Sequence, residues 1–239
     1  MNDSLPNQPP GPTAARFGGE TRVTTAMEDY LKAAYTLEQD GFAVTTLRLA
    51  EELGLSGPSV TNMVKRLDEL NLAVHNRYHG ISLTDTGRRV ALEVIRHHRL
   101  LELYLSEALG YHLDEVHAEA ERLEHHVSEE LESRMERVLG YPQFDPHGDP
   151  IPDRDGHVPS IDDVPLDLMT EGQAGRVSRV SDRDTDRLSY LFSLGVKPGA
   201  RICVLDAMPF DGPLRVEVNQ VEQLLPHSVA QLVRVEPDS

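Results

Sequence analysis

The chain has 239 residues, of which 39% are hydrophobic, so it is long enough to bury one large core or two small ones. It has no run of about 18 apolar residues and its polar start lacks the apolar stretch of a signal peptide, so we expect a cytoplasmic protein without a membrane span. The single cysteine, Cys203, excludes a disulfide framework and a thiolate cluster for zinc or iron–sulfur. A net charge of −17 argues against a basic nucleic-acid-binding surface over the whole chain, but the acidic excess is concentrated between residues 100 and 165.

The N-terminal part of the chain predicts a DNA-binding domain behind a tail. Residues 1–24 are rich in Pro, Gly and small polar residues, which predicts a disordered tail. Residues 25–85 predict three helices and then two extended segments, LAVHNRY and ISLT. The third helix begins with Ser56 as its cap and has Pro58 in its first turn. This order is that of a winged helix-turn-helix, whose recognition helix enters the major groove.

The predicted recognition helix carries polar side chains on the face opposite its apolar one. The residues predicted to contact DNA are Ser56, Pro58, Ser59, Thr61, Asn62, Lys65 and Arg66 of this helix and Arg77 of the wing. Asn62 could pair bidentately with adenine, and Lys65 could contact phosphate. The alternative is a small helical subdomain in which the hydroxyl groups only cap helices. Capping explains neither the other polar residues nor the hairpin, so we favour DNA binding.

Residues 86–145 predict two long helices with metal-binding side chains. The first runs from Thr84 to Gly110, and the second from Leu113 to Leu139. On the second, four residues at positions i, i+4, i+7 and i+8 form one stripe, namely His117, Glu121, Glu124 and His125. The first helix offers His98 and Glu102 at i and i+4. Carboxylates and imidazoles without thiolates suit manganese or ferrous iron, although an acidic helix also brings such groups together by chance.

The C-terminal part predicts a small β domain. Residues 146–165 are rich in Pro, Asp and Gly and predict a linker. Residues 166–239 are rich in β-formers, with strands expected at Arg176–Ser181, Arg201–Asp206, Leu214–Val218 and Val229–Val235 and a helix near Thr185–Leu194. The predicted fold class is therefore mainly α, with a winged helix-turn-helix, a helical dimerisation and metal-binding domain and a small SH3-like β-barrel.

Several stretches resemble the diphtheria-toxin-repressor family of metal-dependent regulators, and in particular its manganese-sensing branch. They are MEDYLKAAYTLE, SGPSVTNMVKRLDELNL, the pair LTDTG and RHHRLLELYL, VHAEAERLEHHVSEELESR, and GDPIP. The resemblance implies a homodimer that binds a palindromic operator when loaded with metal, and a C-terminal SH3-like domain. It implies Mn²⁺ as the cofactor, with Fe²⁺ or another divalent transition metal as an alternative.

The resemblance also implies two sets of ligands. The main site would use Asp29, Glu121, Glu124 and His125, with His98 close by, and the second site His98, Glu102 and His117. In long members the SH3-like domain supplies further ligands to the second site, and the matching segment here is DTDR. The second site would be completed by Asp184 alone, by water, or by Asp186 instead. Asp29 and Glu121 stand where the iron-sensing members have Met and Cys. Compact manganese sensors have an acidic residue one helical turn after the aspartate, whereas this chain has Lys32, which argues against their two-manganese site.

These observations predict a manganese- or iron-dependent transcriptional regulator, mainly a repressor, of metal-homeostasis genes such as uptake transporters. One rival is a metal-independent winged-helix regulator. Another is a metallohydrolase that uses the carboxylate–histidine face, but the chain has no H-E-x-x-H, P-loop or G-x-S-x-G motif, so we expect no enzyme and no small organic substrate.

Overall fold

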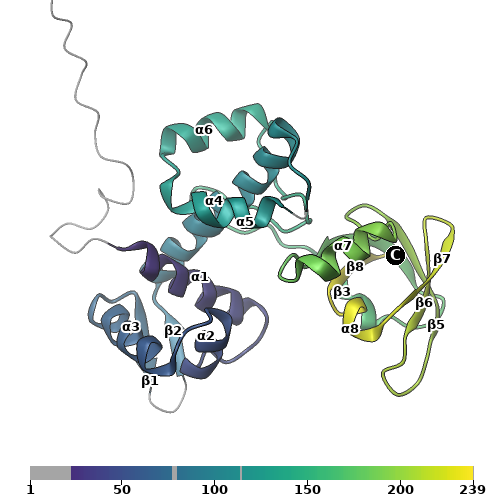
Figure 1. The fold of residues 1–239 in the computed structure, drawn as a ribbon, viewed down its shortest axis with the longest axis horizontal. Coiled ribbons are helices and arrows are strands. Elements are labelled where there is room, and N and C mark those ends of the chain that lie inside the picture. The colour runs from purple at the N-terminus through teal and green to yellow at the C-terminus, as the bar shows by residue number, and fades with distance from the viewer. Residues whose placement is uncertain (1–22, 77–79, 114, 239) are drawn as a thin grey trace, which may run out of the picture.

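The computed structural model describes residues 23–76, 80–113 and 115–238, which form three lobes (Figure 1). The first lobe contains a three-helix bundle with a hairpin, the second is helical, and the third is built on a β-sheet. The expected fold class, mainly α with a small C-terminal β domain, is confirmed. No helix among the described residues has the length and apolarity that crossing a membrane requires.

The first lobe is a winged helix-turn-helix. Its elements are α1 (Thr25–Gln39), α2 (Thr46–Glu52), α3 (Gly57–Glu69), β1 (Ala73–Asn76) and β2 (Gly80–Leu83). The Thr45 side chain accepts from Arg48 N and caps α2, and the Ser56 side chain accepts from Ser59 N and caps α3. β1 and β2 pair antiparallel as the wing. Arg77, predicted to contact DNA, lies outside the described residues.

The predicted tail, residues 1–24, ends earlier than expected. Residues 1–22 lie outside the described part of the chain, but Val23 is buried in the core of the first lobe. The carbonyl oxygen of Thr24 accepts from Met27 N and Glu28 N at the start of α1. Val23 and Thr24 therefore belong to the folded domain, because Val23 packs in its core and Thr24 accepts the first hydrogen bonds of α1.

The long helix α4 (Asp85–Leu109) is shared by two lobes. Thr84 caps its start by accepting from Gly87 N, and Gly110, at φ 74°, ends it. Near its start, Val90 and Ile95 pack in the core of the winged helix, whereas Leu100 and the residues after it pack in the core of the second lobe. A single helix of about 37 Å thus connects the DNA-binding domain to the second lobe.

The second long helix is not continuous, which corrects the prediction for Leu113–Leu139. It is divided into α5 (Val116–Leu123), the 3₁₀ turn η2 (Glu124–His126) and α6 (Glu129–Val138). Val127 is extended, and the Ser128 side chain accepts from Leu131 N to start a new helix with Glu129 and Glu130 in its first turn. The sequence SEEL therefore starts a new helix. The sequence analysis missed this start because the apolar periodicity continues through it.

The segment predicted to be a linker, residues 146–165, packs on α4. Arg96 Nη1 and Arg99 Nη1 donate to the carbonyl oxygens of Pro152 and Pro150, each at 2.5 Å. Ile151 and His147 are fully or almost fully buried. These two hydrogen bonds hold the segment in one path across the helix.

The third lobe is an antiparallel six-stranded sheet with strand order β3-β8-β4-β5-β6-β7. Its elements are β3 (Val164–Pro165), η3 (Leu166–Leu168), β4 (Ala174–Val180), α7 (Thr185–Ser193), β5 (Arg201–Ala207), β6 (Leu214–Val218), β7 (Val221–Leu225), α8 (His227–Ala230) and β8 (Val233–Pro237). The sequence prediction missed β3 and β7, and it extended the last strand into Val229 and Ala230, which lie in α8. Register shifts in β4 and β5 bend the sheet around its buried core.

Candidate metal centre and nucleic-acid interface

A first group of possible metal ligands joins the DNA-binding domain to the second lobe. His125 Nε2 on η2 lies 2.8 Å from Asp29 Oδ1 on α1 and 3.6 Å from Glu124 Oε1. These three residues each offer one ligand atom within 4.8 Å of the others. Glu28, which the sequence analysis missed, is buried with its Oε2 2.6 Å from His125 Nδ1. A carboxylate on the second nitrogen fixes the orientation of the imidazole, as it does in many metal sites.

A second group lies between α4, α5 and the third lobe. His98 Nε2 is 3.0 Å from Glu102 Oε1 and 3.2 Å from His117 Nδ1. His117 Nδ1 is also 3.2 Å from Glu102 Oε1 and 3.3 Å from Asp182 Oδ2. His98, Glu102, His117 and Asp182 therefore form a four-residue group, three of whose members were predicted.

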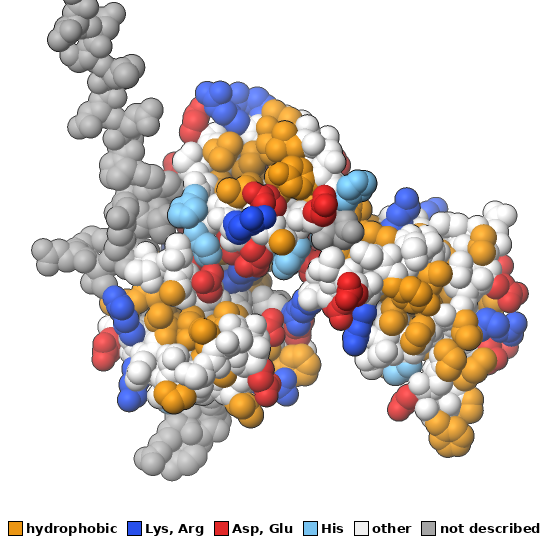
Figure 2. Space-filling model, viewed as in Figure 1, with side chains coloured by type: hydrophobic (Ala, Val, Ile, Leu, Met, Phe, Trp, Pro, Cys, Tyr) orange, Lys and Arg blue, Asp and Glu red, His pale blue; other side chains and the backbone are white. Residues whose placement is uncertain are grey.

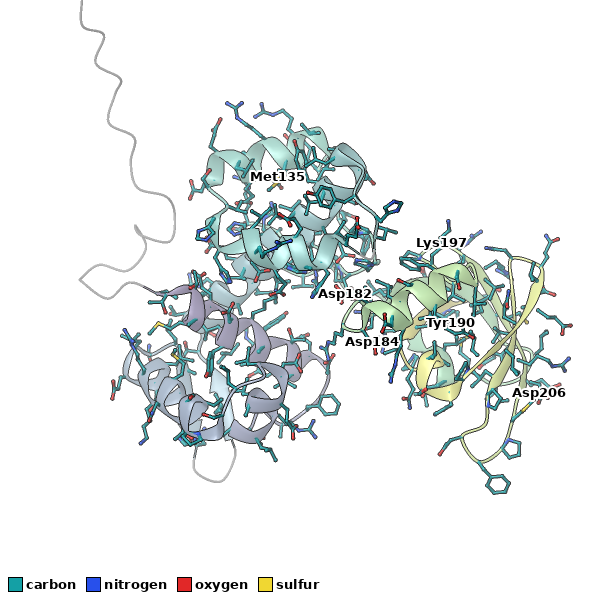
Figure 3. All side chains as sticks on the ribbon, in the orientation of Figure 1. Met135, Asp182, Asp184, Tyr190, Lys197 and Asp206 are labelled. Carbon is teal, nitrogen blue, oxygen red and sulfur yellow. The ribbon has the colours of Figure 1, made fainter. Side chains whose placement is uncertain are left out.

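The acidic residue from the third lobe is Asp182, which corrects the prediction of Asp184. Asp184 caps α7, because its Oδ1 accepts from Arg187 N at 3.1 Å, and its Oδ2 pairs with Arg187 Nε at 3.0 Å. Asp182 precedes the cap and faces the other two lobes (Figure 3). Asp186, the other residue considered, is exposed in the first turn of α7. Helix capping in the DTDR segment was the signal that would have excluded Asp184.

The ammonium of Lys32 lies in the middle of a third group, which consists of His98, Glu121 and Glu124. Lys32 Nζ is 2.6 Å from Glu121 Oε1, 2.8 Å and 3.0 Å from the two Glu124 oxygens, and 3.3 Å from His98 Nδ1. Glu121 was predicted to join Asp29 and His125, but the structure groups it with Lys32 instead. No pattern in the sequence indicated this contact, because Lys32 and its partners are far apart in the chain.

Contacts within the centre stabilise the charged forms of its histidines and carboxylates. Hydrogen bonds to Asp29 and Glu28 raise the pKa of His125 to about 10, against the effect of burial. Contacts with Asp182 and Glu102 raise the pKa of His117 to about 10 in the same way. Burial would raise the pKa of Glu102, but hydrogen bonds to His117 and His98 outweigh it and hold that pKa at about 2. The carboxylates are therefore ionised and paired with imidazolium groups, and a metal ion that bound His117 or His125 would have to displace the proton first.

The donor set fits a divalent metal ion. Glu102 is fully buried and its Oε2 has no hydrogen-bond partner among the described residues. His147 is also fully buried, neither of its ring nitrogens has a partner there, and its Nε2 lies 4.0 Å from Glu102 Oε1. Unsatisfied buried donors and acceptors are costly, so such atoms beside a carboxylate–imidazole group point to a ligand. His147 was missed because its proline-rich surroundings predict a linker.

The predicted DNA-contacting residues of α3 lie together on one exposed face. Ser56, Pro58, Ser59, Asn62, Lys65 and Arg66 are exposed, and Thr61 is half-buried with its hydroxyl donating to Gly57 O. The opposite face, with Val60, Val64 and Leu67, is buried in the core. Neither Lys65 nor Arg66 forms an ion pair with any residue that the structure describes, so both side chains are available to phosphate.

A winged helix joined through one long helix to a buried carboxylate–imidazole centre defines a metal-dependent DNA-binding regulator. Comparison with known families agrees. Residues 22–81 match the iron dependent repressor N-terminal DNA binding domain, residues 84–153 its metal binding and dimerisation domain, and residues 164–237 the FeoA domain. The chain belongs to the iron-dependent repressor family, to which the diphtheria toxin repressor also belongs.

Relatives match over nearly their whole length. The iron-dependent repressor IdeR of Mycobacterium tuberculosis is 37% identical over 221 residues, covering 87% of this chain and 96% of that protein. The diphtheria toxin repressor of Corynebacterium diphtheriae is 30% identical over 219 residues, with the same coverage. Among solved structures, a manganese-dependent transcriptional repressor in complex with manganese is 40% identical, with a TM-score of 0.84, 88% of this chain and 99% of that one being covered.

Proposed function

We propose that this protein is a manganese-responsive repressor, active as a homodimer on a palindromic operator, and that it has no enzymatic activity. The observation that carries the proposal is the contact of Asp29, on the first helix of the DNA-binding domain, with His125 at 2.8 Å. Asp29, Glu124 and His125 would hold one divalent ion, and His98, Glu102, His117 and Asp182 would hold a second. A bound ion supplies positive charge that joins carboxylates from different lobes.

The preference for manganese rests on the donor atoms. Every residue of both groups offers a carboxylate oxygen or an imidazole nitrogen, and the only cysteine, Cys203, lies on β5 in the third lobe. Oxygen and nitrogen ligands without sulfur suit Mn²⁺ better than softer ions, and selectivity then depends on geometry and supply. Relatives named as iron-dependent make Fe²⁺ the natural comparison. We expect Mn²⁺ to support operator binding at least as well as Fe²⁺ under anaerobic conditions.

Dimerisation is supported by an apolar surface on the second lobe. Leu123, Leu131, Val138 and Tyr141 are exposed on or beside α5 and α6, and Figure 2 shows apolar side chains gathered on this lobe. A symmetric dimer through such a surface presents two copies of α3 to DNA. Two recognition helices about 34 Å apart would contact successive major grooves of a palindrome.

The test is selection of bound sequences from a randomised duplex pool in the presence of Mn²⁺, followed by titration of the selected duplex with Mn²⁺, Fe²⁺ and a chelator. We expect binding that needs metal and a selected sequence with twofold symmetry. Glu124→Gln should abolish the activation of DNA binding by metal, because Glu124 belongs to the first group of ligands. The matched control is Glu130→Gln, the same change in an exposed residue of α6 that belongs to none of the groups of possible metal ligands. Equal binding with and without chelator would favour the metal-independent regulator.

A hydrolase on the same centre is the second candidate that the sequence raised. Glu102, Glu124 and His98 are buried. Lys32 on α1 contacts Glu124, and Asp182 of the third lobe contacts His117, so these ligand groups are enclosed from two further sides. A catalytic metal needs an open coordination position for substrate. Burial from several sides therefore supports a regulatory site, and Mn²⁺-loaded protein should leave generic ester and phosphoester substrates unchanged.

A further inference from the structure

The third lobe meets the second lobe at a tight turn, residues 145–149, which we call the docking turn. Asp145 builds this turn, because its Oδ1 accepts from His147 N at 2.8 Å and from Asp149 N at 2.9 Å. The backbone N of Asp145 also donates to Asp149 O at 2.9 Å. Arg99 of α4 lies with its Nε 3.6 Å from Asp145 Oδ2. The docking turn is therefore a fixed part of the second lobe.

The docking turn covers an edge of β4 in the third lobe. β5 and the residues just before it accompany β4 only as far as Val177, although β4 continues to Val180. Beyond that point, Val180 N donates to His147 O of the docking turn at 3.0 Å. An uncovered strand edge leaves backbone groups for another chain to pair with. The docking turn therefore takes the position that a neighbouring strand would otherwise fill.

Gly148 allows the backbones of the two lobes to approach closely. Its φ is 91°, a value that favours glycine, and a Cβ added there would lie 1.9 Å from Ser178 O and 3.1 Å from Arg179 Cα. Ser178 lies at the register shift of β4, where the strand bends. A larger residue at position 148 would therefore push the docking turn and β4 apart.

Two side-chain contacts complete the interface between the docking turn and the third lobe. Arg179 Nη1 lies 3.2 Å from Asp149 Oδ1 of the turn, while Arg179 Nε donates to Asp163 Oδ2 beside β3 at 2.8 Å. The ring of His147 stacks on that of Phe192 of α7, with the centroids 6.2 Å apart and 14° between the planes. His147 is fully buried, so water is excluded from this contact.

The interface needs no metal ion, yet it ends beside a metal group. No residue that forms it belongs to one of the groups of possible metal ligands. Asp182, which does belong to one, follows Val180 by two residues, and Ser181 N between them donates to Leu232 O at 2.9 Å. The backbone that leaves the interface is thus held by one hydrogen bond on each side of β4 just before it reaches Asp182.

We propose that the docking turn holds the third lobe on the second lobe before metal binds, and so keeps Asp182 beside His117 in the metal-free protein. Asp182 Oδ2 lies 3.3 Å from His117 Nδ1 in this arrangement. Metal that binds the second group does not then have to order the third lobe, which favours binding. The role in metal binding rests on the proposed function, whereas the docking itself does not.

The first experiment needs no variant. Hydrogen exchange of wild type is measured with chelator and with saturating Mn²⁺, by mass spectrometry with fragmentation that resolves the amide of Val180. This amide reports docking, because its acceptor is a carbonyl of the docking turn. We expect it to be protected without metal and to slow less than about tenfold when Mn²⁺ is added. An unprotected amide without metal, or a larger slowing, would mean that metal recruits the third lobe and would overturn the inference.

The second experiment compares two glycines. Gly148→Ala should speed exchange of the Val180 amide and weaken Mn²⁺ binding at the second group, each by about tenfold or more, and leave the first group unchanged. Gly172→Ala is the matched control in the third lobe, because Gly172 has a φ of 84° but open space where a Cβ would lie. It should match wild type in exchange and in calorimetric titration with Mn²⁺. Equal effects of the two changes would mean that backbone strain, and not the close approach, is responsible.

A double variant separates positioning of Asp182 from general damage. If Gly148 acts through Asp182, Gly148→Ala should cause no further loss of Mn²⁺ affinity at the second group in a chain that already carries Asp182→Asn. Additive losses would show that Gly148 acts on metal binding by another route.

The outcomes also separate the inference from the proposed function. Wild type that binds no Mn²⁺ but protects the Val180 amide would refute the proposed function and support the docking. Wild type that binds Mn²⁺ at both groups but protects this amide only with metal would leave the function intact and overturn the docking.

Discussion

At the scale of single residues, the exposed face of α3 carries one side chain suited to base contact, Asn62, and one suited to phosphate contact, Lys65. Asn62 is an amide that can offer a donor and an acceptor together to adenine, whereas Lys65 is a point charge on a flexible stem. Both are exposed on the same helix face. Their substitutions should therefore have different consequences.

We predict that Asn62→Ala relaxes sequence preference, and that Lys65→Ala weakens binding to all duplexes and lowers the salt slope by about one. Fluorescence anisotropy with the selected duplex and a scrambled one, over a range of salt, measures both. If Asn62→Ala lost equal affinity for the two duplexes, Asn62 would not read a base.

The two neighbouring aspartates of the third lobe provide a second prediction at this scale. Asp182→Asn should weaken binding at the second metal position by about tenfold or more, because its carboxylate lies 3.3 Å from His117 Nδ1. Asp184→Asn should leave metal affinity unchanged, since Asp184 contacts Arg187 and caps α7. Calorimetric titration with Mn²⁺ distinguishes them, and a larger effect of Asp184→Asn would reverse the assignment.

At the scale of elements, α4 and α6 are joined by a buried ion pair. Arg96 Nε on α4 lies 2.7 Å from Glu132 Oε1 on α6, and His97 Nε2 lies 3.5 Å from Glu132 Oε2. Burial would raise the pKa of Glu132, but His97 and Arg96 outweigh it and lower that pKa to about 2. A carboxyl whose pKa is lower in the folded state stabilises the fold above its unfolded pKa, and this contribution is lost as the pH falls toward 2.

Glu132→Gln should therefore lower the free energy of unfolding by roughly 3 kcal/mol at pH 7, and the difference from wild type should shrink between about pH 4.5 and pH 2. Denaturant unfolding at several pH values measures it. Glu130→Gln is the control, because its pair with Arg134 on the same helix is exposed and is expected to contribute at most about 1 kcal/mol. A pH-independent difference for Glu132→Gln would exclude the ionic explanation.

At the scale of the whole molecule, the segment before α7 links the third lobe to both others. Asp182 contacts His117 of α5, and Arg183 Nη2 lies 2.6 Å from Asp40 Oδ2 at the end of α1. Asp29 and Lys32 link α1 to η2 and α5 on another side. The orientation of the recognition helix therefore depends on contacts made by all three lobes.

Metal should reduce the motion of the DNA-binding domain further. We predict that Mn²⁺ slows hydrogen exchange in α1 of wild type, and that Asp29→Ala removes this effect and most of the metal-dependent DNA affinity while the dimer persists. Exchange measured by mass spectrometry together with light scattering provides the test. Unchanged exchange in α1 while metal still activates DNA binding would place the switch at the second group.

The sequence by itself determined the local structure. Ser56 caps α3 as expected and α4 starts beside Thr84 as expected, because a cap is a contact within one turn. His98 with Glu102 and Glu124 with His125 were identified as possible ligands because they are close in the chain. The tertiary structure decided which of these groups meet. The positions of Lys32, Asp182 and His147 depend on packing between lobes. No periodicity within one element encodes a contact between residues that lie far apart in the chain, such as Lys32 and His98, which are 66 positions apart.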